Sequence, residues 1–417
     1  MHSPVPTPGF MSRFIFPLAS LRNRQTWVWL HRWVGLVMTF FLIVAGLTGS
    51  LLVFYDELDT ALNPEVRIVQ PPYEGAAILD MVTLRGRALA ARPGTWTDSA
   101  IAHWKPGYSL NLWVAPREET TESFEGELFI NPYTGEVLGS RNWGDISQGW
   151  INLMPFIYRL HYSLALGTIG TYLFGIIALL WTLDCFVGAW LTLPRGRPFF
   201  QKWKPAWKIK PKRFNYDLHR ASGLWTWAML FVLAWSSVAL NLYEDVYHPV
   251  TKATLGFTEH PTLAKRDFDQ PEPGMDWQVA YAHAKRLMQS AQEIYSIGEW
   301  REDALRYDEH RAEFNYWIAT KFKNEGEAYD WFGVTFDANT GELLRITEEN
   351  VESNKEQAGD FVTRWIIDLH MAKVWGLPFR IFVCIMGIVV TALSMTGVII
   401  WWRKRKSHSL ALRSRSV

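Results

Sequence analysis

Cysteine is almost absent from this 417-residue sequence: Cys185 and Cys384 are the only two, and both lie inside long apolar stretches. The polar parts of the chain therefore contain no disulfide framework and no thiolate metal site. A glycine-rich nucleotide fingerprint is also missing, so the sequence predicts no nucleotide-binding domain of its own. The chemistry of the chain must come from other side chains.

Charged residues are absent from four stretches of 22 or 23 residues, at 33–54, 162–183, 221–243 and 381–402. A helix rises about 1.5 Å per residue and needs roughly 20 residues to cross a hydrocarbon core of about 30 Å. Each stretch is thus long enough to span a membrane. The predicted fold class is an α-helical membrane protein with four transmembrane helices, at 27–55, 161–193, 216–244 and 370–403.

Acidic residues are nearly missing from three segments that are rich in lysine and arginine. Residues 1–32 carry four basic residues and no acid, 403–417 carry six and no acid, and 194–220 carry nine with Asp217 as the one acid. Segments of this kind face the cytoplasm. We therefore predict cytoplasmic segments at 1–26, 194–215 and 404–417, with both termini inside, and external domains at 56–160 and 245–369.

The first apolar run could be mistaken for a secretory signal, but its 22 residues exceed the roughly 7–15 of such a region. It is predicted to be an uncleaved helix. The basic segment at 194–215 is suited to anionic lipid head groups first and to an acidic redox protein second. We expect no nucleic-acid partner.

The sequence repeats a unit made of a helix, an external domain and a second helix. Leu-His-Arg-x-x-Gly-Leu begins at Leu30 and again at Leu218, and a tyrosine follows each histidine by 24 residues. Leu-His recurs at Leu160 and Leu369, each time with glycines at the same two later offsets. The matched spacing predicts two tandem copies of one fold.

Each external domain is predicted to be a small α+β domain. Turns rich in Asn or Asp and Gly, at 131–135 and 337–341, are flanked by apolar residues. They are typical of β-hairpins whose glycine takes a positive φ. A helix is predicted before each hairpin, at about 80–91 and 276–291.

Four of the eleven histidines fall at repeat-equivalent helix ends: His31, His219, His161 and His370. Two units that cross the membrane in the same sense are related by an axis along the membrane normal, so equivalent residues share a depth. His31 and His219 are predicted to face each other near the cytoplasmic surface, and His161 and His370 near the external surface. A lone interfacial histidine is usually an anchor, but two symmetric pairs favour metal ligation.

Haem suits such pairs because it needs only two axial ligands, and no cysteine or carboxylate joins these histidines in a metal-site spacing. Gly35 and Gly223 lie one turn after the first histidine of each unit, where a missing side chain lets a flat macrocycle approach. Arg32 and Arg220 are placed to neutralise its propionates. The sequence predicts two b-type haems per chain that carry electrons, since both axial positions of each iron are filled.

The two haem sites are predicted to lie far apart. The helix from His31 to Tyr55 covers roughly 36 Å, so transfer between the irons needs macrocycles that lean inward, tilted helices or a relay. The tryptophans of the third helix serve either as such relays or as packing and interface residues: Trp225, Trp227 and Trp235.

The sequence leaves the roles of two further side chains open. Asp184 is a charge within the second predicted helix, but its repeat equivalent is Leu393, so a proton-related role and a local structural role both remain. His248 precedes Pro249 at the external end of the third helix. It either approaches the external haem or a substrate, or caps the helix.

The Leu-His-Arg-x-x-Gly-Leu and Leu-His motifs, with the Thr-Gly-Glu turns at 134–136 and 340–342, resemble the PepSY-associated transmembrane proteins from about Trp27 to Arg405. That family includes bacterial inner-membrane ferric-siderophore reductases. The resemblance implies PepSY-like periplasmic domains, an inner-membrane location, and an oxidoreductase that reduces a ferric siderophore or similar chelate on the periplasmic side.

The resemblance also implies that His31 and His219 ligate the inner haem and that His161 and His370 ligate the outer one. Some relatives carry a fused flavodoxin-like reductase domain, which this chain lacks. The electron donor is then a separate cytoplasmic protein or a membrane quinol.

Two other classes of function stay open. One is a haem-free PepSY scaffold that senses or regulates. The other is a transporter for haem or a metal, which is disfavoured because no broken, charge-bearing pair of helices is predicted at the bilayer midplane. The sequence identifies no catalytic or substrate-binding residue, and it leaves the siderophore and the oligomeric state open.

Overall fold

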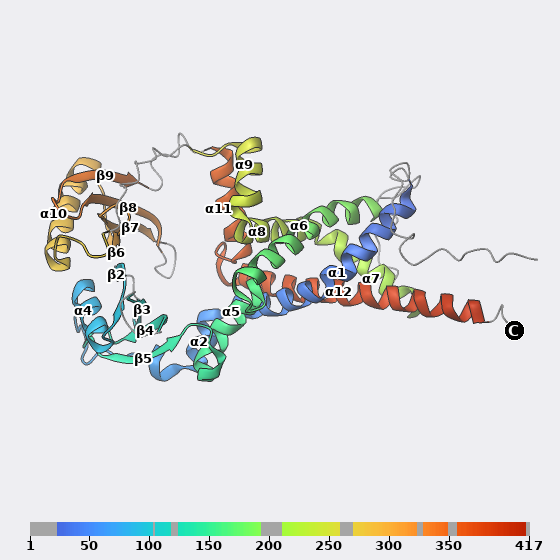
Figure 1. Ribbon diagram of the computed structural model, residues 1–417, viewed down its shortest axis with the longest axis horizontal. Coiled ribbons are helices and arrows are strands. Elements are labelled where there is room, and N and C mark those ends of the chain that lie inside the picture. Colours follow the sequence, from blue (N-terminus) through green and yellow to red (C-terminus); the bar gives the residue numbers. More distant parts are fainter. Residues whose placement is uncertain are drawn as a thin grey trace, which may run out of the picture. The chain divides into compact units, whose positions relative to one another are not determined.

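The computed structural model describes residues 23–102, 105–117, 124–192, 211–258, 270–322, 328–348 and 357–413. The chain divides into two compact units (Figure 1): a helical unit formed by 1–53, 159–251 and 362–417, and an α+β unit formed by 54–158 and 252–361. Both units draw on both repeats. Most of the predicted N-terminal segment, most of the basic segment and the last four residues lie outside the described residues.

The helical unit contains helices long and apolar enough to span a membrane. Three of them qualify alone: α1 (Arg24–Leu52), α6 (Gly167–Thr192) and the Gly376–Ser407 part of α12 (Gly376–Arg413). A bent pair adds a fourth if it is one span: α7 (Pro211–Trp225) and α8 (Trp227–Asn241). The described residues thus hold three or four candidate spans, which agrees with the predicted membrane fold.

The third predicted helix, at 216–244, is not continuous. It breaks at Thr226, and its two halves are bent by 69°. The hydroxyls of Ser222 and Thr226 each donate to a carbonyl one turn earlier, and Gly223 lies between them. Such back-bonding and Gly/Ser pairs bend helices. The first repeat has Val34 and Met38 at the two hydroxyl positions, and α1 runs on unbroken.

The second spanning helix of each repeat begins later than predicted. His161 lies near the end of a short helix, α5 (Leu153–Ser163), and His370 is the last residue of α11 (Ala358–His370). The turn that follows each helix contains residues with positive φ: Leu164, Ala165 and Gly167, then Ala372, Trp375 and Gly376. This left-handed backbone ends the short helix, so the predicted spans at 161–193 and 370–403 each lose their first residues.

Small residues let the spanning helices pack closely. α1 lies beside α12, and α6 beside α8 (Figure 1). A Cβ at Gly46 would lie 2.5 Å from the carbonyl oxygen of Gly387, so the two backbones can approach only because both residues are glycine. Buried Ala234 and Ala178 hold the equivalent positions in α8 and α6. A helix of one repeat therefore packs on a helix of the other.

The α+β unit contains two antiparallel sheets. The first has the order β1-β3-β4-β5, with strands Thr95–Trp96, Leu110–Pro116, Gly126–Ile130 and Val137–Asn142. The second has the order β2-β6-β7-β8-β9, with strands Ser99–Ile101, Arg301–Asp308, Glu313–Phe322, Ala328–Asp337 and Leu343–Glu348. Short helices complete the chain: α2 (Tyr55–Leu62), α3 (Pro64–Arg67), η3 (Ile146–Gln148), η4 (Trp150–Asn152), the π-helical η6 (Tyr243–Tyr247) and α9 (His248–Leu255).

The two external segments are joined more closely than the sequence predicts. Strand β2 comes from the first segment but pairs with β6 of the second, with Ala100 opposite Leu305. Met81 and Ala100 are buried in the same hydrophobic core as Tyr281 and Phe314 of the second segment. The prediction of two separate small domains is therefore wrong in this respect, because the two segments share a sheet and a hydrophobic core.

The predicted helices and hairpins of the α+β unit are confirmed. α4 (Met81–Ala91) and α10 (Trp277–Tyr295) begin where predicted, each behind an aspartate whose side chain accepts hydrogen bonds from the first turn. The hairpins β4–β5 and β8–β9 turn at Gly135 and Gly341, whose φ values are +70° and +78°. Glycine is needed there because other residues are strained at positive φ.

Replacing Asp80 with alanine should loosen α4. Asp80 accepts hydrogen bonds from the amides of Val82 and Thr83 and from the Thr83 hydroxyl, and losing such a cap costs about 1 kcal/mol. Burial acts to raise the pKa of Asp80, but these bonds lower it overall. The stabilisation is therefore present above the ordinary aspartate pKa of about 3.9 and is lost as the pH falls through the lower folded value.

Hydrogen exchange of the α4 amides in the full-length chain measures this effect, with roughly fivefold faster exchange expected for Asp80→Ala at neutral pH. Asp276→Ala removes the repeat-equivalent cap from α10 and is the matched control. It should speed exchange in α10 while α4 is unchanged. Equal exchange of α4 in wild type and Asp80→Ala would contradict the assigned cap.

Candidate functional site

The structure brings the four predicted histidines together as two pairs. His31 of α1 and His219 of α7 have ring centres 6.2 Å apart, and His161 of α5 and His370 of α11 have ring centres 6.1 Å apart. In each pair the ring planes are steeply inclined to each other. The two sites are thus nearly identical in separation, as the sequence repeat predicts.

The Nδ1 atoms of the first pair are bonded to protein acceptors. His31 Nδ1 lies 2.8 Å from the Oδ1 atom of Asp184 on α6. His219 Nδ1 lies 3.1 Å from the carbonyl oxygen of Leu393 and 3.0 Å from the hydroxyl of Thr396, both on α12. A carboxylate and a carbonyl can only accept, so both histidines carry their proton on Nδ1.

The second pair is held in the same way by hydroxyl groups. His161 Nδ1 lies 3.0 Å from the hydroxyl of Thr48, and His370 Nδ1 lies 2.7 Å from the hydroxyl of Ser236. Both hydroxyls donate their own proton to a carbonyl one turn earlier in their helix. They must therefore accept from the histidines, which again fixes the proton on Nδ1.

In the neutral form of each imidazole, Nε2 therefore carries the lone pair. No hydrogen bond to any of these four nitrogens occurs among the described residues. Histidines that bind a metal generally donate their other ring N–H to a carbonyl, carboxylate or similar group, which fixes the tautomer and the ring orientation. The same Nδ1 arrangement occurs at all four histidines here.

The separation within each pair fits one metal ion bound to both rings. Imidazole nitrogen binds a metal at about 2.0–2.1 Å, so two such bonds and the half-rings behind them add to roughly 6 Å. The observed values are 6.2 and 6.1 Å. The described residues contain no group of three or more His, Cys, Asp or Glu side chains that could hold a bare ion. The site suits a group that needs two axial ligands and brings its other donors, as haem does.

The family model for the PepSY-associated transmembrane region matches residues 28–404, a range that includes both repeats and all four histidines. The chain belongs to this family. Comparison with curated proteins gives no match. The family membership agrees with the resemblance noted in the sequence and with the spanning helices of the structure, and it marks the chain as a membrane protein.

The acceptors for the second pair occupy the same place in the two repeats of this PepSY-associated chain. Thr48 follows His31 by 17 residues, and Ser236 follows His219 by 17. Sequence reasoning missed both, because serine and threonine in apolar helices usually bond only to their own backbone. The equal offset was the available signal.

Glycines lie against three of the four imidazoles. A Cβ at Gly188 would lie 3.7 Å from the His31 ring, one at Gly397 would lie 3.5 Å from the His219 ring, and one at Gly49 would lie 2.9 Å from the His161 ring. Gly188 and Gly397 are the repeat-equivalent glycines that follow the Leu-His motifs. They leave room for the first pair of rings.

The other predicted site residues lie near the first pair. An added Cβ at Gly35 would meet nothing within 4 Å, whereas one at Gly223 would touch Leu393 at 3.7 Å. Arg32 and Arg220 directly follow the two histidines and are half-buried. The space at Gly35 is consistent with a flat group beside His31, and the propionate role of the arginines stays a prediction.

The two pairs lie closer along the helices than predicted. His161 reaches α1 at Thr48, and the continuous helix from His31 to Thr48 rises about 25 Å, compared with roughly 36 Å to Tyr55. The ring of His248 packs on Tyr243, with centres 5.7 Å apart. His248 thus has an aromatic partner at its helix end, and a role toward the outer haem or a substrate stays a prediction.

The third-helix tryptophans hold packing positions. Trp227 donates its indole N–H to the Cys185 carbonyl at 2.9 Å and stacks on Phe231, and Trp235 packs on Tyr247. Trp225 is largely exposed. These contacts agree with the packing interpretation, and a relay role stays a prediction.

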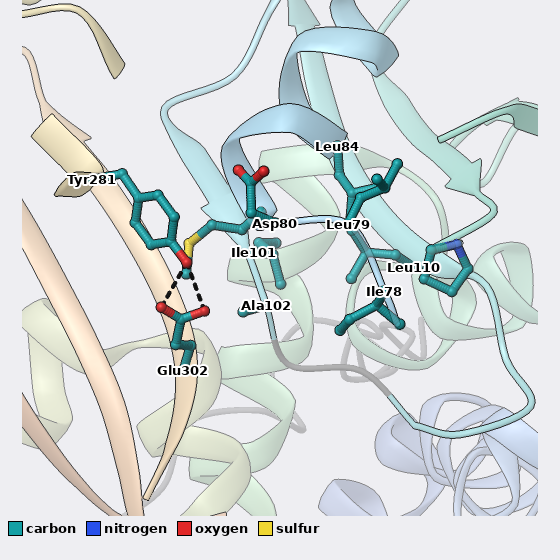
Figure 2. Close-up of a pocket in the computed structure, with 11 residues that line it drawn as sticks. Ile78, Leu79, Asp80, Leu84, Ile101, Ala102, Leu110, Tyr281 and Glu302 are labelled. Atoms are coloured by element: carbon teal, nitrogen blue, oxygen red, sulfur yellow. Dashed lines mark hydrogen bonds between the residues drawn. The ribbon is translucent and has the colours of Figure 1, made fainter. Parts of the chain in front are cut away.

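A cavity of about 220 Å³ lies in the α+β unit and is lined mainly by apolar side chains (Figure 2). Asp80 at its edge caps α4, and Glu302 accepts hydroxyl hydrogen bonds from Tyr281 at 2.6 Å and from Tyr316 at 2.7 Å. Burial, followed by the adjacent carboxylate, raises the pKa of both tyrosines, so they remain donors. Among the described residues that line the cavity, no polar side chain lacks a protein partner, and the cavity belongs to the packing of the unit.

Proposed function

We propose that the chain is a transmembrane electron carrier that binds two b-type haems, one at each histidine pair, and reduces a ferric siderophore or similar chelate. The observation that supports this proposal most directly is the hydrogen bonding of the four imidazoles through Nδ1. Each donates from Nδ1 to the protein and keeps the Nε2 lone pair, and the rings of each pair are spaced for one bound iron.

In this proposal the side chains bind and orient the two groups. His31 and His219 hold one, and His161 and His370 hold the other. Arg32 and Arg220 neutralise acidic substituents, while Gly35 and Gly223 leave room beside the rings. A haem held by two imidazoles would supply a one-electron couple.

The membrane orientation follows from the basic segments. Residues 1–32, 194–220 and 403–417 carry nearly all their charge as lysine and arginine, which supports an orientation with both termini in the cytoplasm. The bacterial inner membrane is what the family resemblance implies. The α+β unit then lies on the periplasmic side. The donor is a membrane quinol or a separate cytoplasmic protein, and the basic segments contact anionic lipid.

The substrate class follows from the chemistry of iron. Siderophores hold ferric iron through hard oxygen ligands, and the softer, less charged ferrous ion is held less tightly. One-electron reduction outside the membrane therefore releases the iron. In this proposal the chain is a ferric-siderophore reductase, and the assignment rests on the chemistry of iron release.

The first test is a reduced-minus-oxidised absorbance spectrum of the detergent-purified chain, with pyridine haemochrome quantification. We expect close to two b-type haems per chain and a low-spin spectrum, because both axial positions are filled. Chain produced with ample haem but containing none would exclude the electron-carrier function. A regulatory scaffold would then be the better explanation.

The bend in the third helix makes transport the second candidate. Transporters often place broken helices at the substrate site, but they do so in corresponding positions of both repeats. Here α7 and α8 are broken at Thr226, while their counterpart α1 is continuous. Uptake of labelled haem or iron into sealed vesicles without net reduction would favour transport over electron transfer.

A further inference from the structure

The two histidine pairs differ in the charge of their Nδ1 partners. His161 and His370 each donate to a hydroxyl, and His219 donates to a carbonyl and a hydroxyl. His31 alone donates to a carboxylate, that of Asp184, at 2.8 Å. The otherwise symmetric set of Nδ1 partners therefore includes one carboxylate, at the His31–His219 pair.

The fold does not need this carboxylate to hold an imidazole. Leu393 is the repeat equivalent of Asp184, and its main-chain carbonyl holds His219 in the corresponding place. The Asp184 side chain is only 10% exposed and lies in the spanning helix α6. Ionisable groups in such positions are costly and tend to be functional. Among the described residues, its hydrogen-bonding partner is His31.

A carboxylate that is hydrogen-bonded to Nδ1 changes how strongly Nε2 donates electrons to a bound metal. It draws the Nδ1 proton toward itself and makes the imidazole a more basic ligand. The additional negative charge also favours the oxidised iron, which carries one more positive charge than the reduced iron. Neutral hydroxyl or carbonyl partners have a weaker effect, because hydrogen bonds to charged groups are roughly twice as strong.

We propose that Asp184 is a positioning residue that lowers the reduction potential at the His31–His219 pair below that at the His161–His370 pair. The inference rests on the proposed function, since it requires both pairs to hold haem. Electrons then move spontaneously from the first pair to the second: one ferrous centre is oxidised, one ferric centre is reduced, and no bond forms or breaks. A quinol or a reduced carrier protein supplies the electron.

The test is a spectroelectrochemical titration of the full-length chain with its haems bound. In wild type we expect two haem components with different reduction potentials. The component with the lower potential should belong to the His31–His219 pair. Asp184→Asn should raise that component so that the reduced-to-oxidised ratio at a fixed potential changes at least about tenfold, which is about 59 mV for a one-electron couple. Asp184→Glu keeps the charge and should restore most of the wild-type value.

Two matched variants assign the shift. In a His370→Ala background only the His31–His219 site remains complete, so its potential is read alone. Thr396→Val removes a neutral partner of His219 and leaves the Leu393 carbonyl in place, so it should shift the potential by less than Asp184→Asn does.

The outcomes separate this inference from the proposed function. A wild-type chain without haem overturns the function and the inference with it. Two haems with the His31–His219 component at the higher potential overturn the inference alone, and so does an unchanged or lower potential in Asp184→Asn. If Asp184→Asn loses the haem, the order of the wild-type potentials and the value for Asp184→Glu decide.

Discussion

Under the proposed function, replacing His370 with alanine should reduce the haem content from two per chain to one and abolish reduction of an external ferric chelate. The His370 ring is 6.1 Å from the His161 ring and provides half of the ligands of that pair. Loss of a partner outside the ligand shell typically costs 10–100-fold in metal affinity, so loss of a ligand should cost more than about 100-fold. The His31–His219 site should keep its haem.

The activity is best measured in sealed vesicles that contain the purified chain, with dithionite inside, a ferric hydroxamate outside and a colorimetric ferrous chelator outside. His161→Ala should behave like His370→Ala. His248→Ala is the matched control, because His248 also lies at a helix end but packs on Tyr243 rather than within a pair. Full reduction by both pair variants would show that the His161–His370 pair does not carry the electrons.

The pairing of the four histidines was predictable because the sequence repeats. His31 and His219 lie in equivalent motifs, and so do His161 and His370. The symmetry of the repeat alone therefore predicts that the two histidines of each pair lie at the same depth in the membrane. Their hydrogen-bond partners were not predictable in the same way. Asp184 and Leu393 hold the first pair, but one uses a side chain and the other its main chain. Comparing the two repeats in sequence shows only that an aspartate in one corresponds to a leucine in the other. It does not show that the main chain of Leu393 takes the place of the Asp184 side chain.

The same contrast holds for the fold. The helices behind Asp80 and Asp276 and the turns at Gly135 and Gly341 were predictable because their signals are local: a cap, a turn residue and alternating apolar residues. The pairing of Ser99–Ile101 with β6 joins segments about 200 residues apart, and three residues have no pattern of their own. The break at Thr226 was not predictable from hydropathy either, because the helices on both sides of it are apolar.

Replacing Arg141 with methionine should destabilise the α+β unit by about 3–5 kcal/mol. Arg141 is buried in β5 and donates to Asp59 at 2.7 Å, to Glu127 at 2.6 Å and to the Ile151 carbonyl at 2.7 Å. Burial alone would lower the pKa of Arg141, but the hydrogen bond to Asp59 and the charge of Glu127 raise it overall. Without the guanidinium, the partners that the fully buried Asp59 keeps among the described residues are Arg67, at the longer distance of 3.5 Å, and the amide of Asn63.

Arg117→Met is the matched control for this prediction, because it removes the same group from an exposed ion pair with Glu272. An exposed pair contributes about 0–1 kcal/mol, so Arg117→Met should leave exchange in the β4–β5 hairpin almost unchanged. Hydrogen exchange in the full-length chain reports both variants. Adding Asp59→Asn to Arg141→Met should recover part of the loss, since it removes the uncompensated charge. If Arg141→Met and Arg117→Met are equally stable, the Asp59–Arg141 pair does not stabilise the packing of α2 on the sheet.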